Sequence, residues 1–255
     1  MKPEVLLKTA KKRGLNGIAV TDHGRIDGAL EIKRLNKDKN FEVIIGEEIS
    51  TMHGDVLAYY LKEQIDAVDF FDAAEKIRKQ NGLIIIPHPF RTSLNRNHKF
   101  KVPLCQKPPV RDGWHDEFSK VQQVVFDTRN TTNNDGRFSS TTHTTNLKIG
   151  GIPLYKIKKY IDAVECFNGR MIFSSDNKKA DIIAGRNNMA KTAGSDAHFK
   201  FEIATGQTLF DGNLRKALKE KKTEAYGKLK FGAFAAFLSF VKCKVALKKL
   251  KFFQA

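Results

Sequence analysis

The sequence predicts an α/β fold of the (β/α)-barrel type, in which short buried strands alternate with amphipathic helices. Apolar runs stand at 17–20, 83–86 and 163–166, the last of them interrupted by Glu165, and such runs between helices are typical of parallel strands buried on both faces. Polar or metal-capable residues follow every run directly. A (β/α) barrel builds its site at the carboxyl ends of its strands, so this repeated order predicts one shared site.

The first unit is a helix, a strand and a polar cluster. A helix is predicted over 3–13, with Pro3 near its start and Gly14 as its stop signal. The strand at 17–20 then ends in Thr21-Asp22-His23-Gly24. This order places an aspartate and a histidine where a parallel strand delivers side chains to a barrel mouth.

The second unit adds a glutamate and an antiparallel extension. The strand at 43–45 leads into Gly46-Glu47-Glu48-Ile49-Ser50. A turn at His53-Gly54-Asp55 follows, and residues 56–61 are predicted to return as an antiparallel strand. Glu48 and Asp55 are therefore expected on either side of one turn.

Three later units repeat the pattern. A helix is predicted over 66–80, and the strand at 83–86 after it runs into Pro87-His88-Pro89-Phe90-Arg91. The strand at 163–166 ends in Phe167-Asn168-Gly169-Arg170, and a strand at 191–193 ends in Gly194-Ser195-Asp196-Ala197-His198. Several strand ends in register are hard to explain by core packing alone.

The chain divides into a barrel domain over 1–210 and a basic C-terminal helical extension over 211–255. The barrel pattern is interrupted at about 97–151 by an insertion rich in Thr and Asn. The extension carries 12 Lys or Arg against 3 Asp or Glu. Its apolar start at 231–241 is too short to span a bilayer, and a packed terminal helix is favoured over a membrane-surface helix.

Composition limits the class of protein. At 255 residues, with 41% hydrophobic and 29% charged residues, the chain fits one sizeable globular domain rather than a disordered or membrane protein. Three cysteines without a CxxC pair argue against disulfides and zinc ribbons, and they predict a cytoplasmic location. The net charge of +17 is consistent with an anionic partner such as nucleic acid, or simply with lysines that solvate the exposed faces of helices. The composition does not indicate an oligomeric state.

The strand-end residues mix imidazole with carboxylate groups. This donor set suits Zn²⁺, Mn²⁺ or Fe²⁺, whereas Mg²⁺ prefers oxygen ligands and is less favoured. Carboxylates that converge at one mouth need cations between them. Two or three such ions can polarise a phosphoryl oxygen and activate water, so the chemistry predicted is hydrolysis of a phosphate ester.

These motifs resemble the PHP (polymerase and histidinol phosphatase) domain, because Thr21-Asp22-His23, Gly46-x-Glu48-Ile49-Ser50, Pro87-His88-Pro89-Phe90 and Gly194-Ser195-Asp196-Ala197-His198 occur in that family's order. Residues 162–169 resemble its TrpH-like branch. The resemblance implies a distorted (β/α)7 barrel and Glu48, His88 and Asp196 as catalytic residues. The implied metal ligands are His23, Glu48, Asp55, His88, Asp196 and His198.

The resemblance also implies supporting roles. Asp22 would orient an imidazole or another hydrogen-bond partner near the metals. Arg91 and Arg170 stand beside ligand motifs, and a guanidinium matches phosphate with two parallel hydrogen bonds. The implied substrate is phosphorylated, with nucleotides or short nucleic acids favoured, including 5′ to 3′ exonucleolytic removal.

Two departures from the family pattern bear on activity. Asp55 stands where many relatives have a histidine, with His53 two residues earlier. The family opens with a strand ending in His-x-His, whereas this sequence begins at the helix start Lys2-Pro3-Glu4. We therefore expect a barrel without its first strand.

Alternative roles stay open. His88 between prolines could serve only a turn, and Asp22 or Asp196 could serve as a helix cap. In place of a nuclease, the chain could be a small-molecule phosphatase of the histidinol phosphatase type. It could also be a catalytically impaired barrel that binds metal or nucleic acid.

Overall fold

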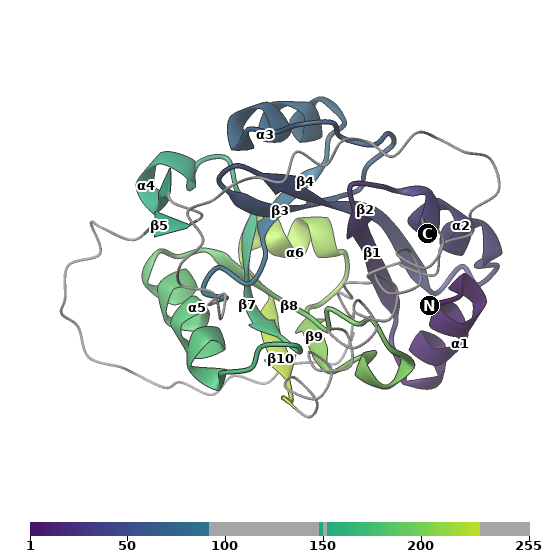
Figure 1. The fold of residues 1–255 in the computed structure, drawn as a ribbon. Coiled ribbons are helices and arrows are strands. Elements are labelled where there is room, and N and C mark those ends of the chain that lie inside the picture. Colours follow the sequence, from purple (N-terminus) through teal and green to yellow (C-terminus); the bar gives the residue numbers. More distant parts are fainter. Residues whose placement is uncertain (92–147, 150–151, 230–255) are drawn as a thin grey trace, which may run out of the picture.

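A curled six-stranded sheet forms the centre of the molecule (Figure 1). The computed structural model describes residues 1–91, 148–149 and 152–229. The sheet order is β1-β2-β3-β4-β7-β8. These strands are β1 (Gly17–His23), β2 (Glu42–Thr51), β3 (Gly54–Tyr59), β4 (Leu83–Ile86), β7 (Ala163–Asn168) and β8 (Ala190–Gly194).

Strand direction brings the polar strand ends to one edge of the sheet. The pairs β1–β2, β4–β7 and β7–β8 are parallel, whereas β3 is antiparallel to both β2 and β4. The first residues of β3 therefore lie at the edge where its neighbours end. The predicted antiparallel return after the turn at 53–55 is confirmed, and it delivers Asp55 to the same edge as Glu48.

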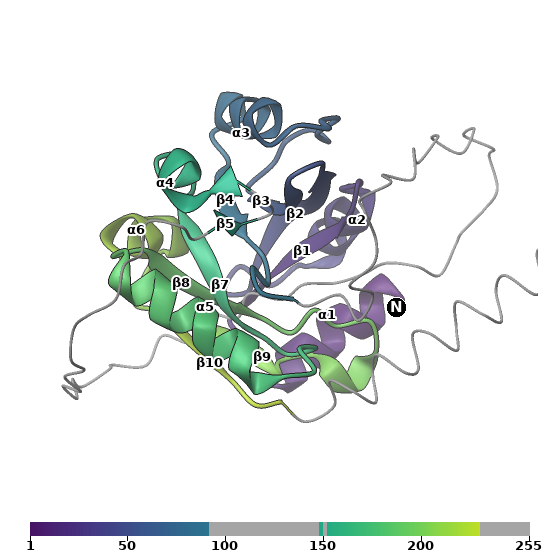
Figure 2. The same cartoon turned by 60° about the vertical axis from the view of Figure 1, so that its left-hand side comes forward.

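Helices cover the outside of the curled sheet (Figures 1 and 2). They are α1 (Pro3–Lys12), α2 (Asp27–Leu35), α3 (Phe70–Lys79) and α5 (Ser174–Arg186), with the single-turn helices α4 (Leu154–Ile157) and η1 (Lys200–Glu202). Their buried residues, such as Leu6, Ile32 and Ile77, share one apolar cluster with the outward side chains of the strands. Helix α3 begins later than predicted because Asp69 accepts hydrogen bonds from the N–H groups of Phe71 and Asp72.

The concave side of the sheet is filled by a different helix. Helix α6 (Leu214–Glu220) lies within the curve of the sheet (Figure 1). Its Leu214 and Leu218 pack with Ile44, Tyr59 and Leu83 from the inward face of the strands. These inward residues lie toward the amino ends of β2 and β4, so α6 closes the interior at the end opposite the polar strand ends.

Two small sheets complete the described structure. Strands β9 (Gly206–Leu209) and β10 (Glu224–Gly227) pair antiparallel, as do β5 (Lys148–Ile149) and β6 (Ile152–Pro153). Nearly all of the predicted insertion at 97–151, and the part of the predicted helical extension after residue 229, lie outside the described residues. No helix in the described ranges is long and apolar enough to cross a membrane.

Most predicted elements are confirmed with small shifts of their ends. The helix predicted over 3–13 is α1, and the strand predicted over 17–20 extends to His23. The strands predicted at 163–166 and 191–193 are β7 and β8. The fold is thus mixed α/β with a curled, barrel-like sheet, as the alternating pattern predicted, with β3 as its antiparallel member.

Gly46 allows β1, β2 and β3 to approach closely just below the site. A Cβ atom at Gly46 would lie 2.6 Å from the carbonyl oxygen of Ala58 and 2.7 Å from Thr21 Cγ2. We expect Gly46→Ala to lower the free energy of unfolding by about 2 kcal/mol, because backbone must move to admit the methyl group. Urea unfolding measures this change.

Gly185→Ala provides the matched control. Gly185 lies exposed in α5, and its added Cβ would come no closer than 3.9 Å to Lys191 Nζ. This substitution should stabilise the protein by about 0.5–1 kcal/mol through helix propensity. Equal effects of both substitutions would contradict the steric account of Gly46.

Candidate metal centre

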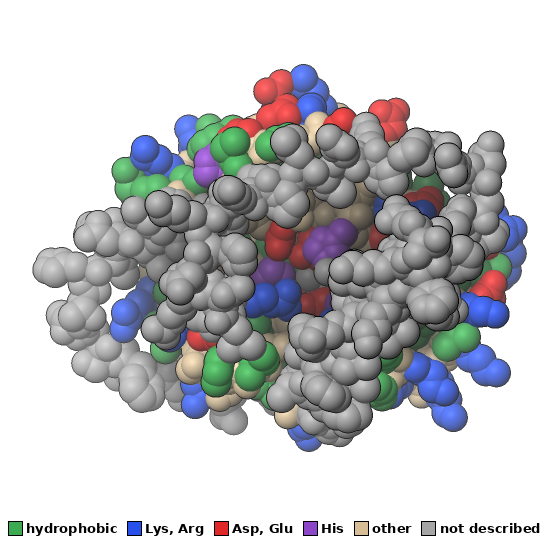
Figure 3. All heavy atoms as spheres, viewed as in Figure 1, with side chains coloured by type: hydrophobic (Ala, Val, Ile, Leu, Met, Phe, Trp, Pro, Cys, Tyr) green, Lys and Arg blue, Asp and Glu red, His purple; other side chains and the backbone are tan. Residues whose placement is uncertain are grey.

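Acidic, imidazole and basic side chains gather in a hollow at the carboxyl ends of the strands (Figure 3). His23 ends β1 and pairs in register with Glu48 of β2. Asp55 begins β3, and His88 follows β4. Side chains alternate between the two faces of a strand, so Glu48 faces the hollow while Glu47 faces the helices outside.

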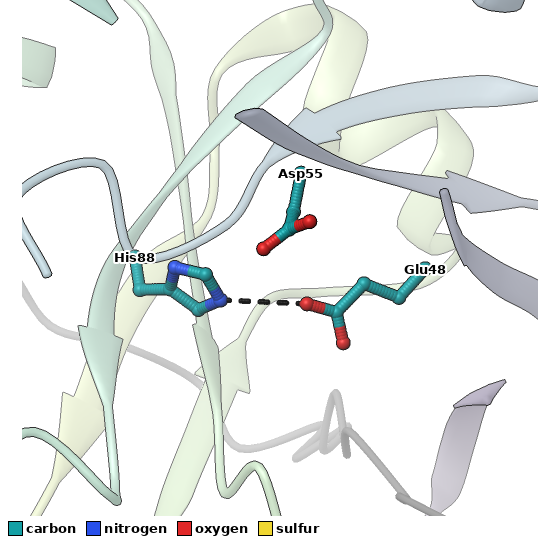
Figure 4. Close-up of side chains that lie close together, drawn as sticks. All are labelled: Glu48, Asp55 and His88. Carbon is teal, nitrogen blue, oxygen red and sulfur yellow. Dashed lines mark ion pairs between the residues drawn. The ribbon is translucent and has the colours of Figure 1, made fainter. Parts of the chain in front are cut away.

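Glu48, Asp55 and His88 form the closest group of metal-capable side chains in the described part of the chain. One ligand atom from each lies within 4.8 Å of those of the others. Figure 4 shows the three side chains pointing toward one another from β2, β3 and the segment after β4. The His88 Nε2 atom lies 3.5 Å from Glu48 Oε1, and Ser50 Oγ donates to Asp55 Oδ1 at 2.9 Å. Three donors of mixed type thus face one point.

The donor atoms fit a divalent cation. Glu48 Oε2 and His88 Nε2 are buried and make no well-aligned hydrogen bond within the described residues, although His23 Nε2 lies 3.2 Å from Glu48 Oε2. Their side chains are only 2% and 8% exposed, so solvent does not satisfy these atoms well. Buried polar atoms without partners cost free energy, and coordination to a cation would satisfy both.

His23 places a second imidazole on the other side of Glu48. Its Nε2 atom lies 3.2 Å from Glu48 Oε2, whereas His88 approaches Glu48 Oε1. The two carboxylate oxygens of Glu48 therefore face two different histidines. This arrangement is compatible with a carboxylate that contacts two cations at once.

Asp196 and His198 lie together after β8. His198 Nδ1 lies 2.9 Å from the carbonyl oxygen of Asp196 and 3.6 Å from its Oδ1 atom. Asp196 has a positive φ of 48°, a backbone conformation that is uncommon outside glycine. Burial raises the pKa of its carboxyl group, but Arg91, His198 and His88 outweigh burial and lower the pKa of Asp196 below its usual range.

The two predicted phosphate-binding arginines both contact carboxylates. Arg91 pairs with Asp196, and its side chain is 42% exposed at the hollow. Arg170 Nε lies 3.1 Å from Glu202 Oε1, and its side chain is 9% exposed. Arg91 is thus the more accessible of the two guanidinium groups.

Asp22 lies apart from the predicted ligands. Its carboxylate extends toward Gly28 in the first turn of α2, and Oδ1 has no hydrogen-bond partner in the described structure. Residues alternate between faces along β1, so Asp22 and His23 project to opposite sides of the sheet. The orienting role predicted for Asp22 therefore has no visible imidazole contact among the described residues, and it stays a prediction.

Burial raises the pKa of Asp22 to about 7, which predicts a pH effect on stability. The folded protein keeps this proton up to about pH 7, whereas an unfolded aspartate releases it near pH 4. Stability is therefore lost as pH rises from about 4 to 7. We compare the free energy of unfolding of Asp22→Asn with that of the wild type, with chelator present. The advantage of the variant should grow by about 2–3 kcal/mol when the pH rises from 5 to 8. Urea unfolding of both proteins at pH 5 and pH 8 measures this change. The same difference in unfolding free energy between variant and wild type at both pH values would contradict the prediction.

Glu165 and Glu202, which the sequence motifs did not predict as site residues, hold the ligand segments in place. Glu165 Oε2 accepts hydrogen bonds from the backbone N–H of His88 at 2.8 Å and from Asn168 Nδ2 at 3.1 Å. Burial raises the pKa of Glu165 to about 7. Glu165 and Glu202 are both 2% exposed, and a charged residue inside an apolar strand was the signal available for Glu165.

A curled α/β sheet with mixed imidazole and carboxylate donors at its strand ends defines a class of metal-binding barrel-like proteins. In sequence, the family model of the PHP domain matches residues 1–134. The family model described as PHP-associated matches residues 174–223. The chain belongs to the PHP domain family, as the motif resemblance predicted.

Two proteins of Methanocaldococcus jannaschii are similar in sequence. MJ1587 is 43% identical over 89 residues, covering 34% of this chain and 52% of MJ1587. MJ0417 is 27% identical over 168 residues, covering 66% of this chain and 51% of MJ0417. The chain spans about half the length of these two relatives.

Two solved structures are similar in fold. PsfC from Pseudomonas syringae PB-5123 superposes with a TM-score of 0.54 at 13% identity, over 95% of this chain and 89% of PsfC. The second is a two-domain protein from Bacteroides vulgatus ATCC 8482, described as containing a predicted PHP-like metal-dependent phosphoesterase. It superposes with a TM-score of 0.49 at 16% identity, over 89% of this chain and 60% of that protein. At these identities the likeness to PsfC concerns the fold alone.

Proposed function

We propose that the protein hydrolyses phosphate esters or phosphodiesters with the help of two or three divalent metal ions. The observation that carries this proposal is the convergence of Glu48, Asp55 and His88 within 4.8 Å at the carboxyl ends of the strands. Membership of the PHP family supports a hydrolase of this kind. Family membership and the donor set both support this reaction class.

The donor set favours Zn²⁺, Mn²⁺ or Fe²⁺ over Mg²⁺ because it mixes imidazole with carboxylate. Glu48 would contact two ions through its two oxygens, with His88 and Asp55 on one ion and His23 on another. Asp196 and His198 would supply the remaining ligands. The bound ions would polarise the phosphoryl group and provide hydroxide near neutral pH.

Arg91 and Arg170 would hold the phosphate of the substrate. The more exposed Arg91 lies beside Asp196, where a phosphate could exchange for the carboxylate as its partner. Arg170 is mostly buried against Glu202, so it would act at the base of the site and contribute positive charge. Both arginines would also position the ester for attack.

Nucleotides or short nucleic acids are the favoured substrates, including 5′ to 3′ exonucleolytic removal. A net charge of +17 would favour a polyanion near the site, and the TrpH-like character of residues 162–169 points the same way. A small-molecule phosphatase is the second candidate enzyme. We also propose that the described sheet is part of a distorted (β/α)7 barrel, and that the three dispersed cysteines reflect a cytoplasmic location.

A binding module without catalysis is the competing function, and the same positive charge favours it. Such a protein would bind metal and nucleic acid but release no product. Hydrolysis assays therefore separate it from the enzyme.

The test is hydrolysis of bis(p-nitrophenyl) phosphate with and without Mn²⁺. We expect hydrolysis above the buffer rate with Mn²⁺, loss of it with excess chelator, and recovery when Mn²⁺ is restored. A wild-type rate equal to background with Mn²⁺, Zn²⁺ and Fe²⁺ alike would contradict the proposal.

A further inference from the structure

A cavity of about 190 Å³ opens beside the metal centre, on the side of Asp55 and His88. Asp55, His88 and Arg91 contribute polar groups to its lining. The apolar part of the wall includes Val56, Phe70, Ile86, Ile152 and Ile157. A group attached to a phosphate at the metals would therefore extend into apolar surroundings.

The apolar wall belongs to the rigid part of the fold. Val56, Ile86 and Ile157 are 1%, 3% and 1% exposed, and all belong to the main hydrophobic cluster. These side chains cannot change rotamer to make room for a larger ligand group without disturbing the packing of the core. They also offer no hydrogen bond, so a charged or heavily hydroxylated group would lose its hydration there without compensation.

One further ionisable group lines the cavity. It is His53, whose Nδ1 atom lies 3.2 Å from Asp69 Oδ2, so its ring is held by a neighbouring carboxylate. The cavity lining thus combines four ionisable side chains with an apolar wall.

We propose that this cavity binds one ring-sized apolar group of the substrate, bonded through oxygen to the scissile phosphate. The inference rests on the proposed function, because it assumes that the phosphate sits at the metals. An apolar cavity of about 150 Å³ accommodates benzene in another protein, and pockets for larger ligands start near 300 Å³. The volume here therefore suits one monocyclic apolar ring, such as a phenyl ring, rather than a fused bicycle. Among the candidate enzymes, such a group favours the small-molecule phosphatase, because a nucleotide would place a hydroxylated sugar next to the phosphate.

The test is calorimetric titration of the Mn²⁺-loaded protein with three phosphonates that are not hydrolysed. Methylphosphonate reports phosphonate binding alone, benzylphosphonate adds one ring, and 2-naphthylmethylphosphonate adds a fused pair. We expect benzylphosphonate to bind about tenfold more tightly than methylphosphonate, because the ring leaves water for an apolar wall. We expect the naphthyl compound to lose this gain.

Substitutions locate the effect. Ile152→Trp fills the cavity and should cancel the difference between benzylphosphonate and methylphosphonate. Ile182→Trp, on the exposed face of α5 where Ile182 is 51% exposed, should keep the tenfold difference. The wild-type series carries the test by itself if the filled variant does not fold.

The outcomes separate this inference from the hydrolase proposal. Equal affinity for methyl- and benzylphosphonate, or a benzyl preference that survives Ile152→Trp, overturns the cavity assignment even if the protein hydrolyses bis(p-nitrophenyl) phosphate. Ring-selective binding without any metal-dependent hydrolysis supports the cavity assignment and overturns the hydrolase proposal.

Discussion

Glu48→Gln is expected to abolish tight metal binding and to lower metal-dependent hydrolysis at least about hundredfold. Loss of a group that merely supports a metal ligand costs about 10–100-fold, so loss of a ligand charge should cost more. Glu48 stands between His23 at 3.2 Å and His88 at 3.5 Å, and it is 2% exposed. Glutamine keeps the shape of the side chain but removes the negative charge. Mn²⁺ titration and the bis(p-nitrophenyl) phosphate assay measure both effects.

Glu47→Gln is the matched control, because Glu47 is the next residue of the same strand and faces the opposite side. Its Oε2 atom accepts a hydrogen bond from the Ile65 N–H at 2.8 Å, and the amide oxygen of glutamine can accept the same bond. Metal affinity and hydrolysis should stay at the wild-type level. Equal losses for both variants would mean that general disturbance of β2, not loss of a ligand, explains the result.

Glu202→Ala is expected to lower the free energy of unfolding by about 3 kcal/mol and to weaken the Asp196–His198 part of the site. Glu202 Oε2 accepts hydrogen bonds from the N–H groups of His198 at 2.7 Å and Phe199 at 2.8 Å. Its Oε1 atom lies 3.1 Å from Arg170 Nε. The substitution removes a buried carboxylate that joins these three partners. Urea unfolding and the number of Mn²⁺ ions bound per chain test it.

Two further variants make this prediction specific. Glu202→Gln keeps an oxygen for the backbone N–H groups and removes only the charge facing Arg170, so its loss should be smaller. Glu220→Ala is the control: Glu220 lies at the exposed end of α6, and its substitution should leave the number of bound ions unchanged. An unfolding free energy for Glu202→Ala that equals the wild type would show that the Glu202 contacts do not support the fold.

The strands and the residues at their ends could be predicted from sequence because both depend on local patterns. Apolar runs marked β1, β4 and β7, and the turn at 53–55 marked the antiparallel return. Strand alternation then decides between neighbours, since it separates Glu48 from Glu47. The same alternation also separates Asp22 from His23, so only His23 projects toward the hollow.

The partners of the buried charges could not be predicted, because they depend on contacts between distant segments. Glu165 meets the backbone of His88 from 77 positions away, and Arg91 meets Asp196 from 105 positions away. Residue type identified both arginines as phosphate-binding candidates, but only the fold shows that they also neutralise Asp196 and Glu202. Tertiary packing, rather than propensity or spacing, sets these pairs.

Anomalous scattering from a Mn²⁺-soaked crystal would locate the ions that the site binds. A peak is expected within about 2.0–2.3 Å of Glu48 Oε1, His88 Nε2 and a carboxylate oxygen of Asp55. The peak should disappear in a crystal of Glu48→Gln and persist in one of Glu47→Gln. A soaked crystal with manganese bound elsewhere and no peak between these three side chains would contradict the account.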